Sequence, residues 1–408
     1  MTSSQLTGLT PLSATTNCQD PQRAYQRLRA QWGSVAPVEL APDVTGWLVM
    51  GYQEVLTLSR QERLFSCNPL HWRAWQEKTV APDSGLGPLM FPRESAHFVD
   101  TAEHRRLRAP LDEGIARIDQ RRLRRRVEAM SADIIAAFAG DGEADLLLSY
   151  SALISMLAVA DLFGLDVGRG RELRDAVVAL VAADSVAQAA YERFEEILAS
   201  ALRSRRDAPP DDLTASFLSH PNLHSEQEVL QAMVVMIFAS YGATTTWIAQ
   251  TLALMLTDPR FAGRLRGGRM GLDDALDEVL WRDPPMANMP ARYALTDTEL
   301  GGQQIRRGDA LILGLGAANS DPLVHSSDPV IELGNRAHLA WGTGPHACPA
   351  QVPARLITRT AVHTALNLLP DLRLALPAGG VPTHPSPWAR CPATLPARFS
   401  PVTPAARR

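Results

Sequence analysis

The chain has 408 residues, with 40 Lys and Arg against 44 Asp and Glu, a formal net charge of −4 and 46% apolar residues. This near-neutral balance disfavours a nucleic-acid binder, and the apolar content excludes a disordered chain. A chain of this length can bury about three quarters of the surface that it exposes when unfolded. Length alone would allow two or three domains, but we expect one globular domain over residues 1–408.

Targeting, membrane and disulfide signals do not stand out in the sequence. Residues 1–20 are polar and lack the apolar core of a signal peptide, and the chain holds no run of about 18 uninterrupted apolar residues. The four cysteines are too scattered for a disulfide framework. We therefore expect a soluble cytoplasmic monomer that neither enters a membrane nor binds nucleic acid.

The first hundred residues divide into two parts. Residues 21–64 mix a short helical pattern with strand-like pieces around Trp47, which predicts a small sheet near the start. Residues 65–100 hold Trp, Pro and Gly without a sustained period, which predicts a long loop with brief helices. Long loops inside compact domains are often functional, so we expect this one to cover a substrate.

Residues 103–283 carry apolar three- and four-residue spacings, which predict a helical body broken near residues 209–212. The longest helix begins at Ser225, where Glu228 completes a capping box, and it stops at Asp258 before a proline. Its span of roughly 45 Å is enough to cross the whole protein. Residues 286–408 return to short strands, at 292–295 and 310–313, so the fold class is mainly α with a small β region.

Residues 338–350 are the most informative stretch: His-Leu-Ala-Trp-Gly-Thr-Gly-Pro-His-Ala-Cys-Pro-Ala, followed by a helical pattern over 352–368. Gly342 and Gly344 let the backbone approach a flat partner closely and adopt dihedrals that other residues avoid. A cysteine just before a helix has its thiolate favoured by the helix dipole. Cys348 is therefore a candidate metal ligand, although burial alone explains most lone cysteines.

This string resembles the cysteine-ligand loop of the cytochrome P450 haem-thiolate family. The resemblance implies that Cys348 ligates the iron of haem b, that Trp341 packs beneath the sulfur, and that His346 pairs with a haem propionate. Gly342 and Gly344 match the two fixed glycines of the loop. The implied fold has a long helix over the haem and the cysteine loop beneath it. Thiolate ligation favours O–O cleavage, so the implied co-substrate is O2.

Three further segments fit the same family. The run at residues 103–108 resembles its propionate-binding helix, which places His104 and Arg108 at i and i+4 on one helix face. A cationic pair there offsets two buried carboxylates. Arg292 matches the strand arginine that reaches the other propionate, and residues 318–322 match a recurrent segment. The resemblance thus covers residues 20–400.

Two departures bear on mechanism. The family usually carries Glu-x-x-Arg, whereas Glu278 is followed at the arginine position by Trp281; Arg282 can still meet Glu278 at i+4. Counting back from residues 258–259, Gly242 stands at the acid of the usual mid-helix acid–threonine pair and Ala243 at the alcohol.

The usual proton relay is therefore missing, unless a local shift brings Thr244 or Thr245 into place. Close helix packing is an alternative explanation for a Gly and Thr cluster of this kind. Without the relay, chemistry in which the substrate supplies hydrogen is favoured.

We therefore expect a haem-thiolate oxidoreductase of bacterial secondary metabolism that oxidises a large aromatic natural product. The favoured reaction is radical C–C or C–N coupling, such as dimerisation of tryptophan-containing diketopiperazines. A conventional hydroxylating or epoxidising monooxygenase that uses Thr244 is one alternative. A non-catalytic haem-binding protein, such as a sensor or carrier, is another.

Family topology places a set of mostly apolar residues near the substrate, although core packing explains each of them about as well. Ser240 and Asn288 are the polar members, and either can orient a substrate amide. The set is Trp72, Leu89, Met90, Met236, Ser240, Tyr241, Ala287, Asn288, Met289 and Trp388.

The chain has no Gly-rich dinucleotide fingerprint and no flavin segment, so electrons must come from outside. The resemblance implies NAD(P)H as their source, with a ferredoxin reductase and a small acidic ferredoxin as carriers. Arg105, Arg106 and the basic run at residues 121–126 offer a positive docking surface. A solvated basic face is the alternative for the end of that run.

Overall fold

The computed structural model describes residues 8–181, 187–205, 212–262, 271–324, 334–375 and 380–402. The chain folds into two compact units, and each unit collects separate stretches of sequence. Unit 1 is Met1–Arg105, Asp277–Cys348 and Thr383–Cys391, and unit 2 is Arg106–Leu276, Pro349–Pro382 and Pro392–Arg408. The single domain stays a prediction.

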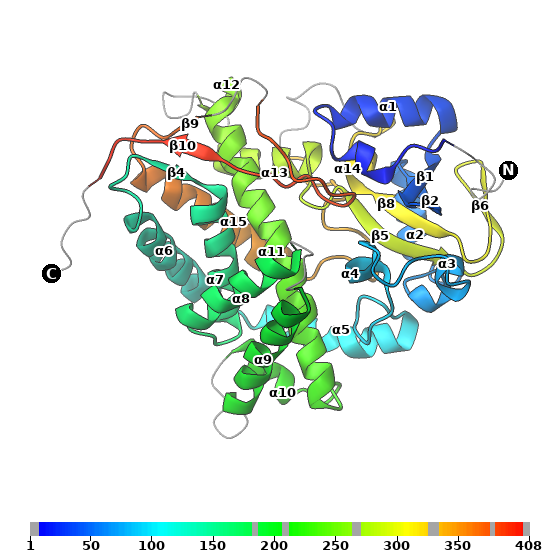
Figure 1. The fold of residues 1–408 in the computed structure, drawn as a ribbon, viewed down its shortest axis with the longest axis horizontal. Helices are drawn as coiled ribbons and strands as arrows, with labels where there is room; N and C mark the ends of the chain where they lie inside the picture. The colour runs from blue at the N-terminus through cyan, green and yellow to red at the C-terminus, as the bar shows by residue number, and fades with distance from the viewer. Residues whose placement is uncertain are drawn as a thin grey trace. The chain divides into compact units, whose positions relative to one another are not determined.

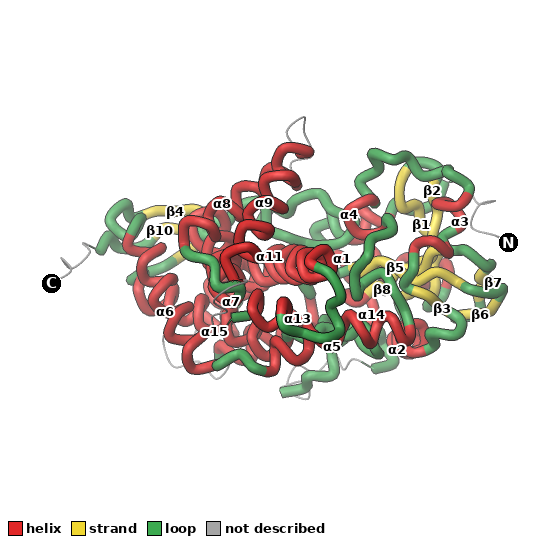
Figure 2. Tube along the Cα trace, turned by 90° about the horizontal axis from the view of Figure 1, so that it is seen from below, coloured by secondary structure: helices red, strands yellow, loops and turns green. Residues whose placement is uncertain are grey.

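Unit 1 is built on a five-stranded sheet of order β1-β2-β8-β5-β3. The pair β2 and β8 is parallel, and the other neighbours are antiparallel. Figure 2 shows these strands gathered together in yellow. A separate hairpin joins β6 to β7. The strands of the unit are β1 (Val35–Ala41), β2 (Val44–Val49), β3 (Phe65–Ser66), β5 (Asn288–Ala294), β6 (Thr298–Leu300), β7 (Gln303–Ile305) and β8 (Ala310–Gly314).

The five-stranded sheet is buried on both faces, because its central strands are apolar at successive positions. Successive side chains point to opposite faces of a strand. Leu48 and Ile312 accordingly join a core cluster that includes Tyr25. Trp47 and Leu311 join a second cluster on the other face. The small N-terminal sheet expected from the sequence is confirmed.

Short helices surround the sheet of unit 1, as predicted for residues 21–100. The first full helix begins where Asp20 accepts a hydrogen bond from the Arg23 N–H at 3.1 Å and Pro21 occupies the first turn. Residues 65–100 hold three brief helices, as the sequence predicted. The helices are η2 (Leu12–Thr15), α1 (Pro21–Trp32), α2 (Tyr52–Arg60), η3 (Pro69–His71), α3 (Arg73–Gln76), α4 (Gly87–Met90) and α14 (Leu315–Asn319).

Two helices, α5 (Thr101–Ala116) and α13 (Leu272–Arg282), carry the chain from one unit to the other. Unit 2 is mostly helical, and its longest helix is α11 (Figure 1). Its helices are α6 (Gln120–Ala136), η4 (Leu147–Ser151), α7 (Ala152–Leu162), α8 (Val167–Val181), α9 (Ala187–Arg205), α10 (Leu213–Leu218), α11 (Glu226–Thr257), α12 (Pro259–Ala262) and α15 (Gln351–Leu368). The mainly α fold class with a small β region is confirmed.

Helix α11 begins as predicted, with the Ser225 hydroxyl accepting from the Glu228 N–H at 3.2 Å. The other half of the capping box differs, because the Glu228 carboxylate accepts from the His224 N–H at 2.7 Å instead of from the cap residue. Arg106 also draws this carboxylate away, with contacts at 2.7 and 3.0 Å. Helix α11 is long and apolar enough to span a membrane, but 56% of its most apolar window is buried, as in a core helix.

Unit 2 also holds a small sheet that the sequence analysis missed, of order β4-β10-β9. Its strands are β4 (Glu143–Asp145), β9 (Arg373–Leu374) and β10 (Pro396–Arg398). Asp145 anchors it, because one carboxylate oxygen accepts from the N–H groups of Leu147 and Leu395, each at 2.9 Å. The predicted helical body is therefore interrupted here. Its other predicted break falls mainly on residues 209–211, which lie outside the described residues.

Candidate functional site

The segment that holds Cys348 is a tight loop of unit 1. The Cys348 N–H donates to the Trp341 carbonyl at 2.8 Å, and the Gly342 N–H donates to the Leu339 carbonyl at 2.8 Å. The Ala347 N–H donates back across the turn as well. Helix α15 begins at Gln351, three residues after the cysteine, as the sequence predicted. These backbone hydrogen bonds hold Cys348 in place within the loop.

The two loop glycines both have positive φ, 67° at Gly342 and 73° at Gly344. Such a backbone strains any residue with a Cβ. Gly344 also lies against α2, where a Cβ would stand 2.4 Å from the Ser59 carbonyl oxygen. Gly344 therefore has two reasons to be glycine, and Gly342 has one.

A cluster of polar side chains lies beside this loop. The rings of His104 on α5 and His346 in the cysteine loop stack with centroids 3.9 Å apart. His346 Nε2 lies 3.9 Å from Asp100 Oδ1, which accepts from the Cys67 N–H at 2.9 Å. Burial raises the pKa of the Cys67 thiol to about 12. The two histidines predicted to pair with propionates are thus together.

Some of these atoms are also close enough to share a metal ion. The ligand atoms of Glu62, His104 and His346 lie within 4.8 Å of one another, as do those of Cys67, Asp100 and His346. Both groups share His346, so they form one polar cluster, the one beside the cysteine loop.

Arg292 on β5 provides the test of whether this cluster suits a haem group. Its side chain is only 6% exposed, and its guanidinium donates to the Ala291 carbonyl at 3.1 Å. Across the described part of the chain, no carboxylate forms an ion pair with it. A buried cation is costly without a counter-charge. The propionate of a haem would supply that counter-charge, so the residues present fit the group.

His97 is a member of this region that the sequence analysis missed. Burial, together with the positive charges of Arg292 and His104, lowers the pKa of His97 to about 4. These neighbours place His97 within electrostatic reach of both predicted propionate partners. A His three residues before an Asp gives no sequence signal, because only the folded loop brings it to the cluster.

The other predicted propionate ligand, Arg108, lies one turn beyond His104 on α5. Its Nε donates to Asp112 Oδ1 at 2.7 Å along the same helix. Its side chain is half-buried, and the role predicted for it stays a prediction. Arg106, predicted for a docking surface, instead pairs with Glu228 and lowers the pKa of that carboxyl to about 2.

The middle of α11, in unit 2, carries the positions of the usual acid and alcohol. A Cβ built at Gly242 would meet nothing within 4 Å, so the helix faces open space at the position of the acid. Thr244 and Thr245 are buried, and the Thr245 hydroxyl has no hydrogen-bond partner among the described residues. Ala243, at the position of the alcohol, is partly exposed.

The predicted substrate residues of unit 1 are largely packed into its core. Trp72, Met90 and Trp388 are buried in one apolar cluster, against which Leu89 also packs. Ala287 is buried, and Met289 packs partly against the second cluster. Core packing therefore accounts for these side chains in unit 1, and substrate contact stays a prediction.

The two polar members of the set already make hydrogen bonds. Asn288 is fully buried, and its amide nitrogen donates to Thr15 Oγ1 at 2.9 Å and to the Pro387 carbonyl at 2.8 Å. The Ser240 hydroxyl donates to the Met236 carbonyl at 2.5 Å, one turn back on α11. These contacts favour a structural role for both side chains. Tyr241 is partly exposed.

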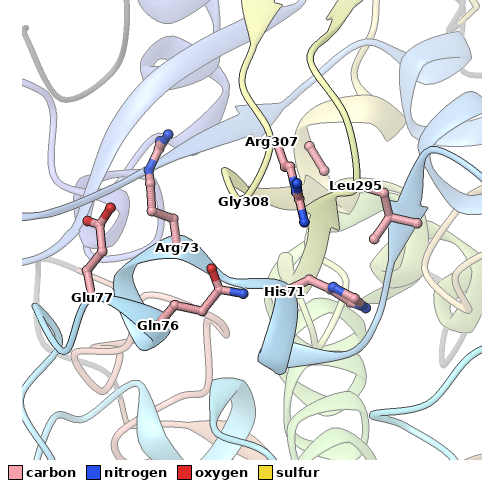
Figure 3. Close-up of a pocket in the computed structure, with 8 residues that line it drawn as sticks. His71, Arg73, Gln76, Glu77, Leu295, Arg307 and Gly308 are labelled. Carbon is pink, nitrogen blue, oxygen red and sulfur yellow. The ribbon is translucent and has the colours of Figure 1, made fainter.

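Unit 1 contains a polar cavity of about 240 Å³ between the α3 segment and the turn before β8. Figure 3 shows His71, Arg73 and Gln76 on one side of it and Arg307 on the other. None of the predicted substrate residues lines it. The cavity therefore does not test the predicted substrate set.

No protein-family model matches the chain, but many individual proteins do. The chain is 26% identical to a 2-hydroxy-5-methyl-1-naphthoate 7-hydroxylase of Streptomyces carzinostaticus, over 86% of this chain and 88% of that protein. It is 27% identical to the cytochrome P450 monooxygenase PikC of Streptomyces venezuelae, over 95% and 93%.

Solved structures give the same result for the fold. The cytochrome P450 enzyme CxnD, described as acting in C–S bond formation in chuangxinmycin biosynthesis, aligns with a TM-score of 0.84 at 24% identity. The alignment covers 97% of this chain and 99% of that one. With the cysteine loop and the curated relatives, it supports one conclusion: the chain has the cytochrome P450 fold and is similar over most of its length to cytochrome P450 oxidoreductases.

Proposed function

We propose that Cys348 is the axial ligand of a haem b iron and that the protein oxidises a large aromatic natural product. The observation that carries the first part is the cysteine loop, whose backbone hydrogen bonds and two positive-φ glycines fix Cys348 just before α15. The helix dipole at that end favours the thiolate form. The family itself binds haem through a cysteine thiolate and uses O2.

His346, His104 and Arg292 would hold the haem propionates, with Arg108 as a further partner from α5. Bound haem supplies an iron that activates O2, with the thiolate favouring O–O cleavage. Arg292 would gain the counter-charge that no carboxylate among the described residues gives it. The adjacent rings of His104 and His346, 3.9 Å apart between centroids, would add their N–H donors to this propionate site.

The reaction that we favour is oxidative coupling of two aromatic rings. Its support is Gly242 and Ala243, which replace an acid and an alcohol on α11 and leave the helix without a side-chain proton donor there. A substrate N–H or O–H group can then provide hydrogen. One solved protein of this fold, CxnD, is described as an enzyme of C–S bond formation, which supports a bond-forming reaction here.

The stoichiometry of coupling differs from that of hydroxylation. In coupling, two substrate hydrogens are removed and one C–C or C–N bond forms. O2 is reduced to two waters by two electrons from the substrates and two from the redox partner, with two protons taken from solvent. In hydroxylation, one oxygen atom enters the product and one becomes water.

Turnover of a tryptophan-containing cyclic dipeptide under isotopically labelled O2 separates the two reactions. Coupling gives an unlabelled dimer that has lost two hydrogen atoms. A product that consists only of labelled, oxygen-inserted material would contradict coupling. The Thr244→Ala variant gives a second test, because it should leave the coupled yield per electron unchanged.

Conventional hydroxylation through Thr244 is the second candidate, and two observations favour it. The relatives reported above include a named hydroxylase and a monooxygenase, and Thr244 is buried one position beyond the expected alcohol. In that case Thr244→Ala would raise the number of reducing equivalents consumed per product molecule, and Thr244→Ser would return this ratio to the wild-type value.

We also propose that electrons from NAD(P)H arrive through a ferredoxin reductase and an acidic ferredoxin in the cytoplasm. Arg121, Arg122 and Arg125 on α6 are exposed and offer positive charge for docking. Arg124 and Arg126 pair with Glu128 and Asp161, so less of the run is available than the sequence suggested. High salt should slow the reduction.

A further inference from the structure

The end of α13 is tied directly to the segment that leads into the cysteine loop. Trp281 Nε1 donates to the Asn335 carbonyl at 2.8 Å. The Trp281 ring meets the His338 ring edge-on, with centroids 5.8 Å apart and planes at 86°. One turn earlier on α13, Asp277 Oδ2 lies 3.2 Å from Arg336 Nε. Residues 335–338 are thus held by α13 from two positions.

A third tie runs through Asn319 at the end of α14. Its amide nitrogen donates to the Leu280 carbonyl at 2.8 Å, and its amide oxygen accepts from the Leu339 N–H at 2.7 Å. The Leu339 carbonyl then accepts from Gly342 at the start of the cysteine turn. The hydrogen bonds therefore run continuously from α13 to the loop of Cys348.

The ion pair of Glu278 with Arg282 is the simplest replacement for Glu-x-x-Arg, but it is weaker than the contacts of Trp281. Arg282 Nη1 lies 3.4 Å from Glu278 Oε1, and the Arg282 side chain is 61% exposed. An exposed pair of this kind contributes little to stability. The arginine of the Asp277–Arg336 pair is just as exposed, at 63%, but its carboxylate is only 10% exposed, against 22% for Glu278. Trp281 is only 6% exposed, and its partly buried hydrogen bond to the Asn335 carbonyl is better shielded from water than the Arg282–Glu278 pair. Trp281 is therefore the stronger tie.

We infer that Trp281, supported by Asp277, is a positioning residue that holds residues 335–339 and, through them, the thiolate loop of Cys348. Trp281 and Asp277 together take the place of the Glu-x-x-Arg arrangement that the chain lacks. The inference rests on the proposed function of Cys348 as the iron ligand. Trp281 acts through the loop backbone and has no part in the chemistry.

The first test compares Trp281→Phe and Asp277→Asn with the control Arg282→Gln in the haem-loaded protein. Phe keeps an aromatic ring at this position and removes the N–H donor together with the pyrrole part of the indole. The measurement is made under carbon monoxide in dilute urea. It compares the amount of protein that shows the thiolate band with the amount that has lost this band, and the readout is the ratio of the two. Loss of this hydrogen bond corresponds to a roughly five- to tenfold fall in the ratio. Asp277→Asn should give a smaller fall and Arg282→Gln none.

The second readout does not depend on haem. Trypsin cleaves after Arg336 only when residues 335–339 open locally, and the fragment mass identifies that cut. In haem-free protein, Trp281→Phe and Asp277→Asn should raise the rate of this cut several-fold over wild type, and Arg282→Gln should not. Equal rates in all four proteins would overturn the inference.

The outcomes distinguish this inference from the proposed function. A wild-type protein without the thiolate band contradicts the role of Cys348, whereas a normal band that Trp281→Phe and Arg282→Gln leave equally intact contradicts only the role of Trp281. Should Trp281→Phe fail to fold, Asp277→Asn, Arg336→Gln and their double variant give the coupling of that pair. A coupling of zero would overturn the inference.

Discussion

Replacing Asn288 by alanine tests whether this fully buried amide is a structural clamp. Its nitrogen donates to Thr15 Oγ1 at 2.9 Å and to the Pro387 carbonyl at 2.8 Å, so it joins an N-terminal segment to a late turn. Two lost hydrogen bonds cost about 1 kcal/mol each, and a buried carbonyl left without a donor adds ~1 kcal/mol or more. We expect the free energy of unfolding to fall by about 3 kcal/mol.

The matched control is Asn17→Ala, which removes the same side chain between the same two segments. Asn17 Oδ1 accepts from the Ser386 N–H at 3.0 Å, but this contact is exposed, so we expect a loss of about 0.5 kcal/mol. Urea titration followed by tryptophan fluorescence measures both variants. Equal losses would refute the clamp, as would an Asn288→Ala variant that keeps its stability and binds substrate less tightly.

Three further variants follow from the site. Gly344→Ala should lose the thiolate band, because the Cβ would stand 2.4 Å from the Ser59 carbonyl oxygen and the residue has positive φ. His97→Gln should reduce the acid-induced loss of stability in haem-free protein. Because the pKa of His97 is lowered, its contribution to wild-type stability is full above pH 6.5 and falls by ~3 kcal/mol as the pH drops to about 4. Glu228→Gln should lower the free energy of unfolding at pH 7 by ~1 kcal/mol, because it removes the charge pair with Arg106. The pKa of Glu228 is lowered by Arg106, so the contribution of this pair is present above pH 4.5 and is lost as the pH falls through about 2.

Each of these predictions has a result that would contradict it. Gly302 has positive φ but open space around it, so the control Gly302→Ala separates backbone strain from the steric clash. A normal thiolate band in Gly344→Ala would show that the cysteine loop tolerates a Cβ at this position. Denaturant titrations at several pH values measure the other two variants. An unchanged slope in His97→Gln, or a Glu228→Gln variant as stable as wild type at pH 7, would exclude the assigned role.

The fold and the centre of the site were predictable because their signals are local in sequence. The cysteine loop needs two glycines and a cysteine at fixed spacing, and the three backbone hydrogen bonds that shape its turn, from the N–H groups of Gly342, Ala347 and Cys348, lie within residues 339–348. The long helix was predictable because Ser225 caps it and Pro259 stops it. The propionate roles of His104 and His346 came from the family resemblance and stay predictions, and the structure brings the two rings together at 3.9 Å between centroids.

The remaining features depend on contacts between distant segments, which no periodicity shows. Strand β4 exists because Asp145 binds the backbone of Leu395, some 250 residues away. His97 reaches the propionate cluster only when the loop is folded. In the sequence, Trp281 indicated only the loss of an arginine, whereas the structure shows its N–H bound to the carbonyl of Asn335. Asn288 was predicted to contact substrate, because the sequence does not show that its hydrogen-bond partner Thr15, in a distant segment, lies beside it.

The most direct test of the account is the absorbance of the reduced, haem-loaded protein under carbon monoxide, compared between wild type and Cys348→Ser. We expect the wild type to give the long-wavelength band of a thiolate-ligated iron and the serine variant to lack it. A wild type without that band, or a Cys348→Ser variant that retains it, would contradict the assignment of Cys348 as the iron ligand.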